Sequence, residues 1–376
     1  MASKITEADE QRLRECLDLA ATAKGQTSPN PMVGALVVTR DGTVVGRGYH
    51  RRCGEPHAER HALEQAGQQA RDATLYVNVE PCCHQGQTPP CTDAVIEAGV
   101  TRVVACHVDP DERVAGRGFA ALEEAGIDVA AGGLVDDAVA LNAGYLTVKT
   151  EGRVCVTGKA ALSLDARLAT RLRQSQWITG PESRQYAHEV RASHDVVMVG
   201  IGTVLADDPS LDARTGDATR PRYRAVVDTK LRTPPTAKVF EVEQGDVVII
   251  TTDAAPPARV TQLEDAGAQI LVTGVDAHGR VDLREALRKL TGLGVSTCLV
   301  EGGGALLTTA FDAGIIDRVV LFYAPILIGG RAAPQLWGGE GTAELGAAPR
   351  LMRPEHRQFG ADRVIEGYLR LPRPGR

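Results

Sequence analysis

An ordered set of potential metal ligands, His57, Cys82 and Cys91, constrains this chain more than any other feature. One imidazole and two thiols fill three corners of a zinc tetrahedron and leave the fourth for water, as in a catalytic zinc site. Glu59 lies two residues after His57 and has no evident duty as a ligand. Its carboxylate is therefore free to carry protons. Any fold of this chain must bring these side chains to one point.

The order His-x-Glu followed by Pro-Cys is typical of zinc-dependent base deaminases, in which the second cysteine follows three residues after the first. Here Cys91 comes nine residues after Cys82, so a loop must leave and re-enter the site. His57 and Cys91 are each expected to open a helix, whose positive end favours a thiolate. The alternative is a closed structural zinc site, drawing four ligands from His57, Cys82, Cys83, His84 and Cys91. That alternative leaves Glu59 without a role.

Composition narrows the class of protein. A chain of 376 residues is too long to fold around one ordinary hydrophobic core and is long enough for two domains. The net charge of −6 argues against a nucleic-acid partner, which would call for a basic face. The charged first residues lack the apolar stretch of a secretion signal, and no apolar run is long enough to cross a bilayer. We therefore expect a cytoplasmic protein without a membrane partner.

Hydrophobic periodicity predicts alternating strands and helices in both halves, hence an α/β fold. In the first half, helices are predicted at 10–24, 57–70, Thr92–Ala98 and Phe119–Ala125, and strands at Ala35–Thr39, Thr43–Gly46, Thr74–Val79, Arg102–Cys106 and Val129–Ala130. In the second half, helices are predicted at 181–192, 256–266, 282–291 and 304–313, and strands at Val154–Lys159, Asp195–Gly200, Arg224–Asp228, Asp246–Thr251, Ala268–Val272, Thr297–Val300, Val319–Tyr323 and Val364–Leu371. We place the domains at 1–149 and 150–376.

Two glycine turns in the second half suit a cofactor with a pyrophosphate. Glu301–Gly304 follows a predicted strand and precedes a helix, and Gly200–Thr203 follows another strand. Glycine at such a turn lets a phosphate approach backbone N–H groups. Taken alone, each turn is also explained as a tight connection, and neither is a Gly-x-Gly-x-x-Gly fingerprint.

These residues resemble a known family, the RibD bifunctional enzymes of riboflavin biosynthesis. In the first half the matching segments are Ser28–Gly34, Gly48–His50, Gly54–Glu59, Glu80–Cys82, Gly86–Cys91, Asp109–Pro110 and Val114–Gly118. In the second half they are Ser163–Asp165, Ser175–Thr179, Gly202–Val204, Asp207–Pro209 and Glu301–Gly303. The segments occur in the same order over nearly the whole chain, and the family's own spacing accounts for the long gap between the cysteines.

The resemblance implies a cytidine-deaminase-like zinc domain followed by a domain similar to dihydrofolate reductase. The first would deaminate 2,5-diamino-6-ribosylamino-4(3H)-pyrimidinone 5′-phosphate. The second would use NADPH to reduce the ribosyl group of 5-amino-6-(5-phosphoribosylamino)uracil to ribityl. The implied partner is this small pyrimidine nucleotide. We also expect a homo-oligomer, whose number of copies the sequence does not give.

By the same resemblance, His57, Cys82 and Cys91 bind zinc and Glu59 shuttles protons. The implied cofactor-binding residues are Ala161, Trp177, Thr203, Asp207, Thr229, Gly303 and Gly304. The implied substrate-binding residues are Ser175, Arg191, Leu211, Arg214 and Glu301. Further candidates are Asn30, His50, Lys159 and Asp165, and Lys230 or Arg232 for the 2′-phosphate of the cofactor.

The chain also departs from the family pattern. Ala166 stands where the family has glycine, and Arg171–Gln174 replaces a stretch of small residues. These loops suggest an alternative in which the deaminase is active and the reductase is altered or inactive. Two further hypotheses are a deaminase of free cytidine or tRNA with an unrelated second domain, and a structural zinc module joined to a nucleotide-binding regulatory domain.

Overall fold

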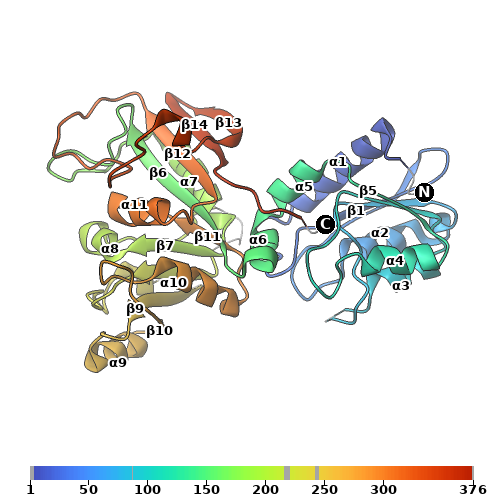
Figure 1. Cartoon of the computed structure of the whole chain (residues 1–376), viewed down its shortest axis with the longest axis horizontal. Helices are drawn as coiled ribbons and strands as arrows, with labels where there is room; N and C mark the ends of the chain where they lie inside the picture. Colours follow the sequence, from blue (N-terminus) through green and yellow to red (C-terminus); the bar gives the residue numbers. More distant parts are fainter. Residues whose placement is uncertain (1–3, 87, 216–220, 242–244, 375–376) are drawn as a thin grey trace. The chain divides into compact units, whose positions relative to one another are not determined.

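The structure is a computed structural model that describes residues 4–86, 88–215, 221–241 and 245–374, so Gln87 of the matching loop lies outside the described residues. The chain forms two compact units, Met1–Gly152 with Leu371–Arg376, and Arg153–Arg370, each built on its own sheet (Figure 1). The predicted boundary after residue 149 lies within helix α6 (Ala143–Glu151), whose C-cap, Gly152, has a φ of 65° that suits a helix C-terminus. In the described part of the chain, no helix has both the length and the apolar character needed to cross a membrane.

The first unit is a five-stranded sheet with helices on both faces. Its elements are α1 (Glu7–Ala21), β1 (Gly34–Val38), β2 (Val44–Tyr49), α2 (Ala58–Ala66), η1 (Gly67–Ala70), β3 (Thr74–Val77), α3 (Cys91–Glu97), β4 (Arg102–Ala105), α4 (Arg117–Glu124), β5 (Asp128–Ala131), α5 (Val135–Leu141) and α6. The strand order is β2-β1-β3-β4-β5, with β3, β4 and β5 parallel and the other pairs antiparallel. Helices α2, α3 and α4 cover one face, and α1 and α5 the other (Figure 1).

Helix α2, which carries the predicted metal ligand and proton shuttle, lies unusually close to β2. A Cβ atom added to Gly46 would stand 2.0 Å from the Ala62 carbonyl oxygen, and one added to Gly48 would stand 2.2 Å from that of Ala58. Only glycine lets helix and strand backbones approach so closely. These two glycines therefore set the position of the helix that presents His57 and Glu59.

The second unit is a nine-stranded sheet. Its elements are β6 (Cys155–Ser163), α7 (Pro181–Ala192), β7 (Val196–Gly200), α8 (Ile201–Asp207), β8 (Tyr223–Val227), η2 (Lys238–Phe240), β9 (Asp246–Thr252), α9 (Pro257–Asp265), β10 (Ala268–Thr273), α10 (Leu283–Leu290), η3 (Thr291–Leu293), β11 (Thr297–Val300), α11 (Gly304–Asp312), β12 (Arg318–Ala324), η4 (Leu345–Ala347), β13 (Met352–Phe359) and β14 (Asp362–Tyr368). The order is β10-β9-β8-β7-β11-β6-β12-β14-β13. The neighbouring strands from β10 across to β12 are all parallel to one another. Strand β14 is antiparallel to β12, and β13 is antiparallel to β14.

The parallel strands place their carboxyl ends at one edge of the sheet. The core on one face is covered by α10 and α11, and the core on the other by α7, α8 and α9. In open sheets of this kind, ligands bind outside the carboxyl ends of the strands. The segments after β6, β7, β8 and β11 are therefore neighbours at the edge where a site is expected.

One buried carboxylate holds both ends of the second unit. Arg153, its first residue, pairs with Asp317 at 2.7 Å, and Arg370, its last residue, pairs with the same carboxylate at 2.8 Å. Asp317 also accepts a hydrogen bond from the Val156 backbone N–H at 2.8 Å. The chain thus enters and leaves this unit at one fixed point.

The predicted α/β class and the alternation of strands and helices are confirmed, including the hairpin around Asp41 and Gly42. Among the α-helices and strands of the described residues, α5, α6, α8 and β13 were not predicted, and neither were the short helices η2 and η4. Strand β13 is polar and exposed along nearly its whole length and pairs with β14 alone, so it carries no hydrophobic alternation from which to predict it. The segment after β7 was expected to be a glycine turn, but it continues into α8, whose Ile201 and Val204 pack into the core.

Candidate functional site

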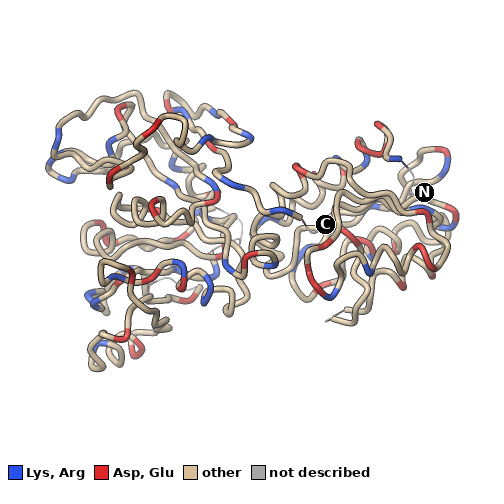
Figure 2. The backbone as a smooth tube through the Cα atoms, viewed as in Figure 1, with Lys and Arg blue, Asp and Glu red and all other residues tan. Residues whose placement is uncertain are grey.

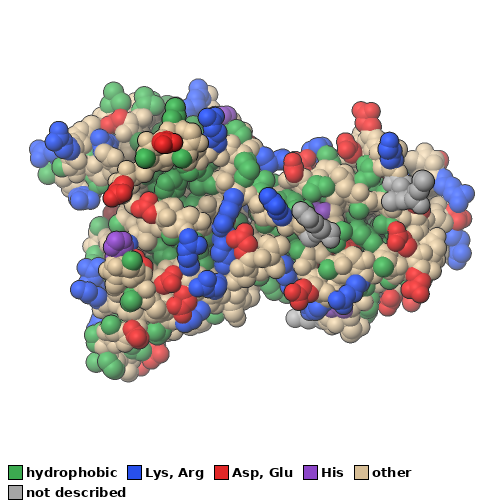
Figure 3. Space-filling view, in the orientation of Figure 1, with side chains coloured by type: hydrophobic (Ala, Val, Ile, Leu, Met, Phe, Trp, Pro, Cys, Tyr) green, Lys and Arg blue, Asp and Glu red, His purple; other side chains and the backbone are tan. Residues whose placement is uncertain are grey.

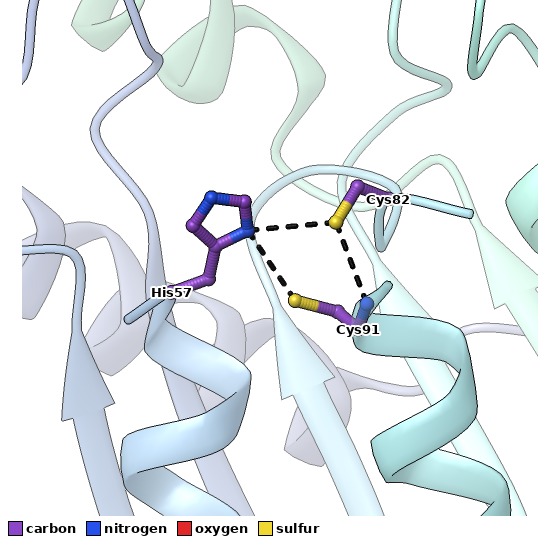
Figure 4. Close-up of side chains that lie close together, drawn as sticks. All are labelled: His57, Cys82 and Cys91. Atoms are coloured by element: carbon purple, nitrogen blue, oxygen red, sulfur yellow. Dashed lines mark hydrogen bonds between the residues drawn. The ribbon is translucent and has the colours of Figure 1, made fainter. Parts of the chain in front are cut away.

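In the first unit, the structure brings His57, Cys82 and Cys91 together (Figure 4). His57 is the N-cap of α2, Cys82 follows β3, and Cys91 is the first residue of α3. The backbone N–H of Cys91 donates to the Cys82 carbonyl at 3.0 Å, which closes the loop between the two cysteines. The three ligand atoms lie within 4.8 Å of one another.

The spacing of these atoms fits a tetrahedral zinc ion. Nitrogen and sulfur ligands at zinc-bond lengths from one tetrahedral centre stand about 3.6 Å apart. His57 Nδ1 lies 3.5 Å from Cys82 Sγ and 3.3 Å from Cys91 Sγ. Cys83 is engaged elsewhere, because its thiol points to the Arg113 carbonyl oxygen at 3.7 Å. Among the described residues, the grouped donors are thus one imidazole and two thiols, a set typical of a zinc site with an open position.

The electrostatics of the cluster favour a thiolate at Cys82. Its interaction with Cys91, and then that with His57, lower the pKa of the Cys82 thiol to about 4 although burial opposes this. The interaction with Cys82, together with burial, raises the pKa of the Cys91 thiol. The contact with Cys82 also raises the pKa of His57. These shifts favour one thiolate on the sulfur pair, and binding of a cation would stabilise a second.

Glu59 lies on the first turn of α2 and is buried, with 3% of its surface exposed. Its Oε2 atom finds no hydrogen-bond partner among the described residues. Burial raises the pKa of this carboxyl. A buried carboxyl with an unused oxygen and a raised pKa is suited to accepting and returning a proton.

Asn30 and His50, the two further candidates in this unit, form a pair beside the cluster. The Asn30 amide nitrogen lies 3.1 Å from His50 Nε2, and His50 Nδ1 lies 3.3 Å from the Pro56 carbonyl oxygen. Because the carbonyl can only accept, Nδ1 carries the proton and Nε2 accepts from the amide. Burial lowers the pKa of His50, and its ring meets the His57 ring edge-on at a centroid distance of 5.1 Å.

Glu80 is a residue whose role the sequence argument missed. Its carboxylate is buried and accepts four backbone hydrogen bonds, from Asp109 and Gly116 at Oε2 and from Gly118 and Phe119 at Oε1, at 2.8 to 3.1 Å. It thereby fastens Asp109 and the first turn of α4 (N-cap Gly116) to the segment that leads from β3 into Cys82. The glycines at 116 and 118 were a visible signal, but nothing in the sequence linked them to Glu80.

In the second unit, the structure joins three of the predicted residues in a buried ion cluster. The Glu301 carboxylate, 3% exposed, lies 2.7 Å from Arg191 Nε and 3.3 Å from Lys159 Nζ. Lys159 is on β6 and Glu301 follows β11, and these strands are parallel neighbours, whereas Arg191 comes from α7. Burial lowers the pKa of Lys159, and the charges of Arg191 and Lys159 outweigh burial and lower that of Glu301 to about 2.

Other predicted residues of this unit lie on these parallel strands or on the segments that follow them. Thr203, on α8 after β7, accepts a hydrogen bond from the Gly303 N–H at 3.1 Å, where Gly303 caps α11 and Gly304 opens it. Ala161 lies on β6, Thr229 follows β8, and Asp207 ends α8 with its pKa raised by burial.

Four more predicted residues lie on loops, and their contacts differ. Trp177 is 70% exposed with the Arg184 guanidinium 4.7 Å from its ring centre, and Ser175 lies half-buried in the same loop. Leu211 is buried in the core, with a φ of 57°. Arg214 lies against Asp212, at 3.3 Å. Arg191 donates to the Asp212 carbonyl oxygen at 3.1 Å, so both arginines contact Asp212.

The Asp165 carboxylate connects the turn after β6 to the loop after β12. It accepts the backbone N–H groups of Ile328 and Gly329 at 3.0 and 2.7 Å and the Ser163 hydroxyl at 2.7 Å, and these bonds, led by that from Ile328, keep the pKa of its carboxyl low. Its carboxylate oxygens are therefore occupied in joining two loops.

Charge is mixed over both units. Acidic and basic residues alternate along the backbone (Figure 2), and the face seen in Figure 3 shows both signs interspersed with apolar side chains. Local pairs such as Arg191 with Glu301, rather than a broad field of one sign, therefore define the electrostatics of the sites.

Comparison with known proteins gives a family match for each of the two units. Residues 6–107 match the model of the cytidine and deoxycytidylate deaminase zinc-binding region, and residues 154–365 match the RibD C-terminal domain. The riboflavin biosynthesis protein RibD of Bacillus amyloliquefaciens is 40% identical, covering 94% of each chain, and that of Aquifex aeolicus is 41% identical, covering 86% of this chain and 89% of its relative.

Solved structures give the same result. The RibD of Acinetobacter baumannii superposes with a TM-score of 0.85 at 33% identity, covering 96% of this chain and 99% of the other. The diaminohydroxyphosphoribosylaminopyrimidine deaminase/5-amino-6-(5-phosphoribosylamino)uracil reductase of Thermotoga maritima gives 0.83 at 31% identity, covering 96% and 98%. Both halves of the chain therefore match RibD proteins, which excludes the hypotheses of an unrelated second domain and of a regulatory zinc module. This chain belongs to the RibD family of riboflavin biosynthesis proteins.

Proposed function

We propose that the first unit hydrolyses the exocyclic amine of 2,5-diamino-6-ribosylamino-4(3H)-pyrimidinone 5′-phosphate. We further propose that the second unit reduces the ribosyl group of the product, 5-amino-6-(5-phosphoribosylamino)uracil, with NADPH. The observation that carries the proposal is the grouping of His57, Cys82 and Cys91 beside a buried Glu59 with an unused oxygen. The name of the Thermotoga maritima relative supports both reactions.

In the deaminase site, His57, Cys82 and Cys91 would hold zinc and leave one position for water. Zinc supplies a Lewis acid that makes water nucleophilic near neutral pH. Glu59 would take the proton from that water and return it to the departing amine, so that ammonia leaves as a neutral molecule. Its raised pKa suits both transfers, because the carboxyl has to hold the proton between them.

In the reductase site, the Lys159–Glu301–Arg191 cluster would bind the nucleotide and supply a proton. NADPH supplies a hydride to the sugar C1′, and the ring oxygen must gain a proton as the ring opens. Lys159 is the candidate donor, because burial lowers its pKa and so makes its ammonium a stronger acid. Glu301 holds both Arg191 and Lys159 in place.

The alternative of an inactive reductase is not favoured. The family model spans the departing loops, and the turn at Ala166 closes normally, with Ala166 N–H donating to the Ser163 carbonyl at 2.9 Å. A cytoplasmic location and a homo-oligomeric state stay predictions of the sequence.

The proposal is tested by giving the purified protein the diaminopyrimidinone nucleotide and NADPH. Ammonia release and NADPH oxidation are both expected. Ammonia release without NADPH oxidation would reject the reductase assignment.

Glu59→Gln tests the proton shuttle. The amide keeps the shape of the side chain and cannot accept a proton, so ammonia release should fall by about 100-fold or more while zinc stays bound. Glu64→Gln is the matched control, since Glu64 is exposed on the same helix. Zinc content by atomic absorption and ammonia release are measured on both variants. Retention of most deaminase activity in Glu59→Gln would refute the assignment.

A further inference from the structure

Asn142, at the junction of α5 and α6, holds the backbone of a residue 110 positions earlier in the chain. Its Oδ1 atom accepts the Met32 N–H at 2.8 Å, and its Nδ2 atom donates to the Met32 carbonyl at 3.0 Å. The side chain is buried, with 3% of its surface exposed. A primary amide offers both an acceptor and donors, so it pairs with both backbone groups of one residue. Met32 is therefore fixed at its N–H and at its carbonyl.

A second buried asparagine, Asn78, reinforces this contact from the end of β3. Its Nδ2 atom also donates to the Met32 carbonyl, at 3.0 Å, and its Oδ1 atom accepts the Gly34 N–H at 2.8 Å. The Met32 carbonyl thus accepts two hydrogen bonds, which is the full capacity of its two lone pairs. Two amides from different parts of the first unit therefore hold the segment that enters β1.

The held segment carries Asn30, which lies two residues before Met32. The Asn30 amide nitrogen faces His50 Nε2 at 3.1 Å, and the His50 ring meets the His57 ring edge-on at 5.1 Å. The Asn30 N–H also donates to the Thr27 carbonyl at 2.8 Å, which closes the turn in front of it. A displacement of Met32 would therefore move Asn30 relative to the proposed zinc site.

The helix that begins after Asn142 holds a second segment of the same site. Tyr145 lies one turn further along α6, on the same face, and its hydroxyl donates to Asp109 at 2.7 Å. The Asp109 N–H in turn donates to Glu80 at 3.0 Å, two residues before Cys82. One face of α6 therefore contacts two of the segments from which the deaminase site is built.

We propose that Asn142 is a positioning residue of the deaminase, which acts through Met32 on Asn30. This inference rests on the proposed deaminase function of the first unit. With the bonds to Met32 present, the Asn30 segment is ordered before the nucleotide binds. Without them, only a fraction of the molecules has the segment in place, and the apparent affinity falls by that fraction. The chemical step at zinc and Glu59 does not involve this segment, so the KM should respond more than kcat.

The test measures ammonia release from the diaminopyrimidinone nucleotide by the full-length protein carrying Asn142→Ala. The KM for the nucleotide should rise by about tenfold, because two neutral hydrogen bonds are lost, while kcat changes by less than about twofold. Zinc content should be unchanged, and so should NADPH oxidation with 5-amino-6-(5-phosphoribosylamino)uracil supplied directly. Hydrogen–deuterium exchange, followed by mass spectrometry, should become faster in the peptide that contains Met32.

Tyr76→Phe is the control for a loss of stability alone. The Tyr76 hydroxyl donates to the buried Asp9 carboxylate at 2.8 Å, between β3 and α1, so this change removes a buried hydrogen bond of the same unit. It should lower the urea midpoint of the first unit and leave the KM unchanged. An equal rise of the KM in Tyr76→Phe would show that Asn142 acts on stability only, and it would overturn the proposal.

A double-mutant cycle tests whether Asn142 acts through Asn30. Asn30→Ala alone should raise the KM, and adding Asn142→Ala should raise it by less than about twofold more, because a positioning residue has no effect once the group it positions is gone. Multiplicative effects of the two changes would overturn the proposal, and so would an Asn30→Ala variant with the KM of the wild type.

If Asn142→Ala does not fold, Asn142→Asp decides. It keeps the shape of the side chain and the acceptor for the Met32 N–H, but it turns an oxygen toward the Met32 carbonyl in place of a donor. The KM should rise here too, and an unchanged KM would contradict the proposal. A wild-type protein that releases no ammonia from the nucleotide would instead refute the proposed deaminase function, on which this inference rests.

Discussion

Among single residues, Glu301 and Asp109 show how differently two buried carboxyls behave. Glu301 lies between two cations, which lower its pKa to about 2 against the effect of burial. Asp109, 6% exposed, accepts a hydrogen bond from the Tyr145 hydroxyl at 2.7 Å, and burial raises its pKa to about 6. The first carboxyl stabilises a site as an ion, and the second is more stable when protonated.

Glu301→Gln should therefore damage the reductase selectively. The change leaves Arg191 and Lys159 buried without their counter-ion, which costs about 3–5 kcal/mol in comparable buried pairs. NADPH oxidation should fall by about 100-fold or more while ammonia release stays near that of the wild type. Both activities are measured on one preparation, with urea unfolding to monitor the second unit. Equal losses of the two activities would contradict a role confined to the reductase.

Asp109→Asn should stabilise the first unit in a pH-dependent way. The folded carboxyl keeps its proton up to about pH 6, whereas an unfolded one releases it near its model value of 3.8. Folding thus takes up a proton between these values, so the stability of the wild type falls as the pH rises from about 4 to 6 and is flat above. The neutral amide escapes this loss, which reaches about 3 kcal/mol at pH 8 and is below about 1 kcal/mol at pH 4. Urea unfolding of both proteins at the two pH values measures it, and a pH-independent difference would show that the charge of Asp109 is not the cause.

At the scale of elements, the departures from the family pattern become interpretable. The missing glycine at 166 is more than a change of composition, because Ala166 occupies the left-handed region with a φ of 59° in the turn that follows β6. An L-residue with a Cβ atom is strained there. The turn nevertheless forms, and Asp165 beside it still holds the loop at Ile328 and Gly329.

Ala166→Gly should stabilise the second unit by about 1 kcal/mol, since glycine adopts this conformation without strain. Ala254→Gly is the matched control, because Ala254 is an exposed turn residue without a positive φ, where glycine only adds freedom to the unfolded chain. Urea unfolding followed by tryptophan fluorescence measures both. The two variants should shift in opposite directions, and destabilisation by Ala166→Gly would show that the turn is not strained.

At the scale of the whole molecule, each unit has its own sheet and its own hydrophobic cores. The ligands of the proposed zinc site all come from the first unit, and the Lys159–Glu301–Arg191 cluster comes from the second. The two reactions should therefore be separable by treatments that affect one site.

Removal of zinc with 1,10-phenanthroline should abolish ammonia release, because water is a weak nucleophile at neutral pH without a metal. NADPH oxidation with 5-amino-6-(5-phosphoribosylamino)uracil supplied directly should continue unchanged. Thermal unfolding should show a lower midpoint for the first unit alone, since the ligand stabilises the unit that binds it. Added zinc should restore the deaminase. Chelated protein that still deaminated its nucleotide at the original rate would rule out the metal site.

Local chemistry was enough to predict that His57, Cys82 and Cys91 lie together near Glu59, and it was enough to predict the two-unit α/β class and most strands, because each depends on short segments. His57 and Glu59 share one helix start, Cys82 and Cys91 close one loop, and buried strands are apolar runs. The polar edge strand β13 had no such signal.

Other features depend on residues far apart in the chain. Glu301 contacts Lys159 because β11 and β6 are neighbours in the sheet. Glu80 accepts hydrogen bonds from Asp109 and from the first turn of α4 because the sheet places β3 beside β4. The inward orientation of the Asp228 carboxylate likewise follows from the packing of Leu231 and from the hydrogen bonds that Arg259 donates to the same turn. The order of strands in the sheet and the burial of side chains determine these contacts. Neither can be predicted from the spacing of residues along the chain, because both depend on how distant segments pack.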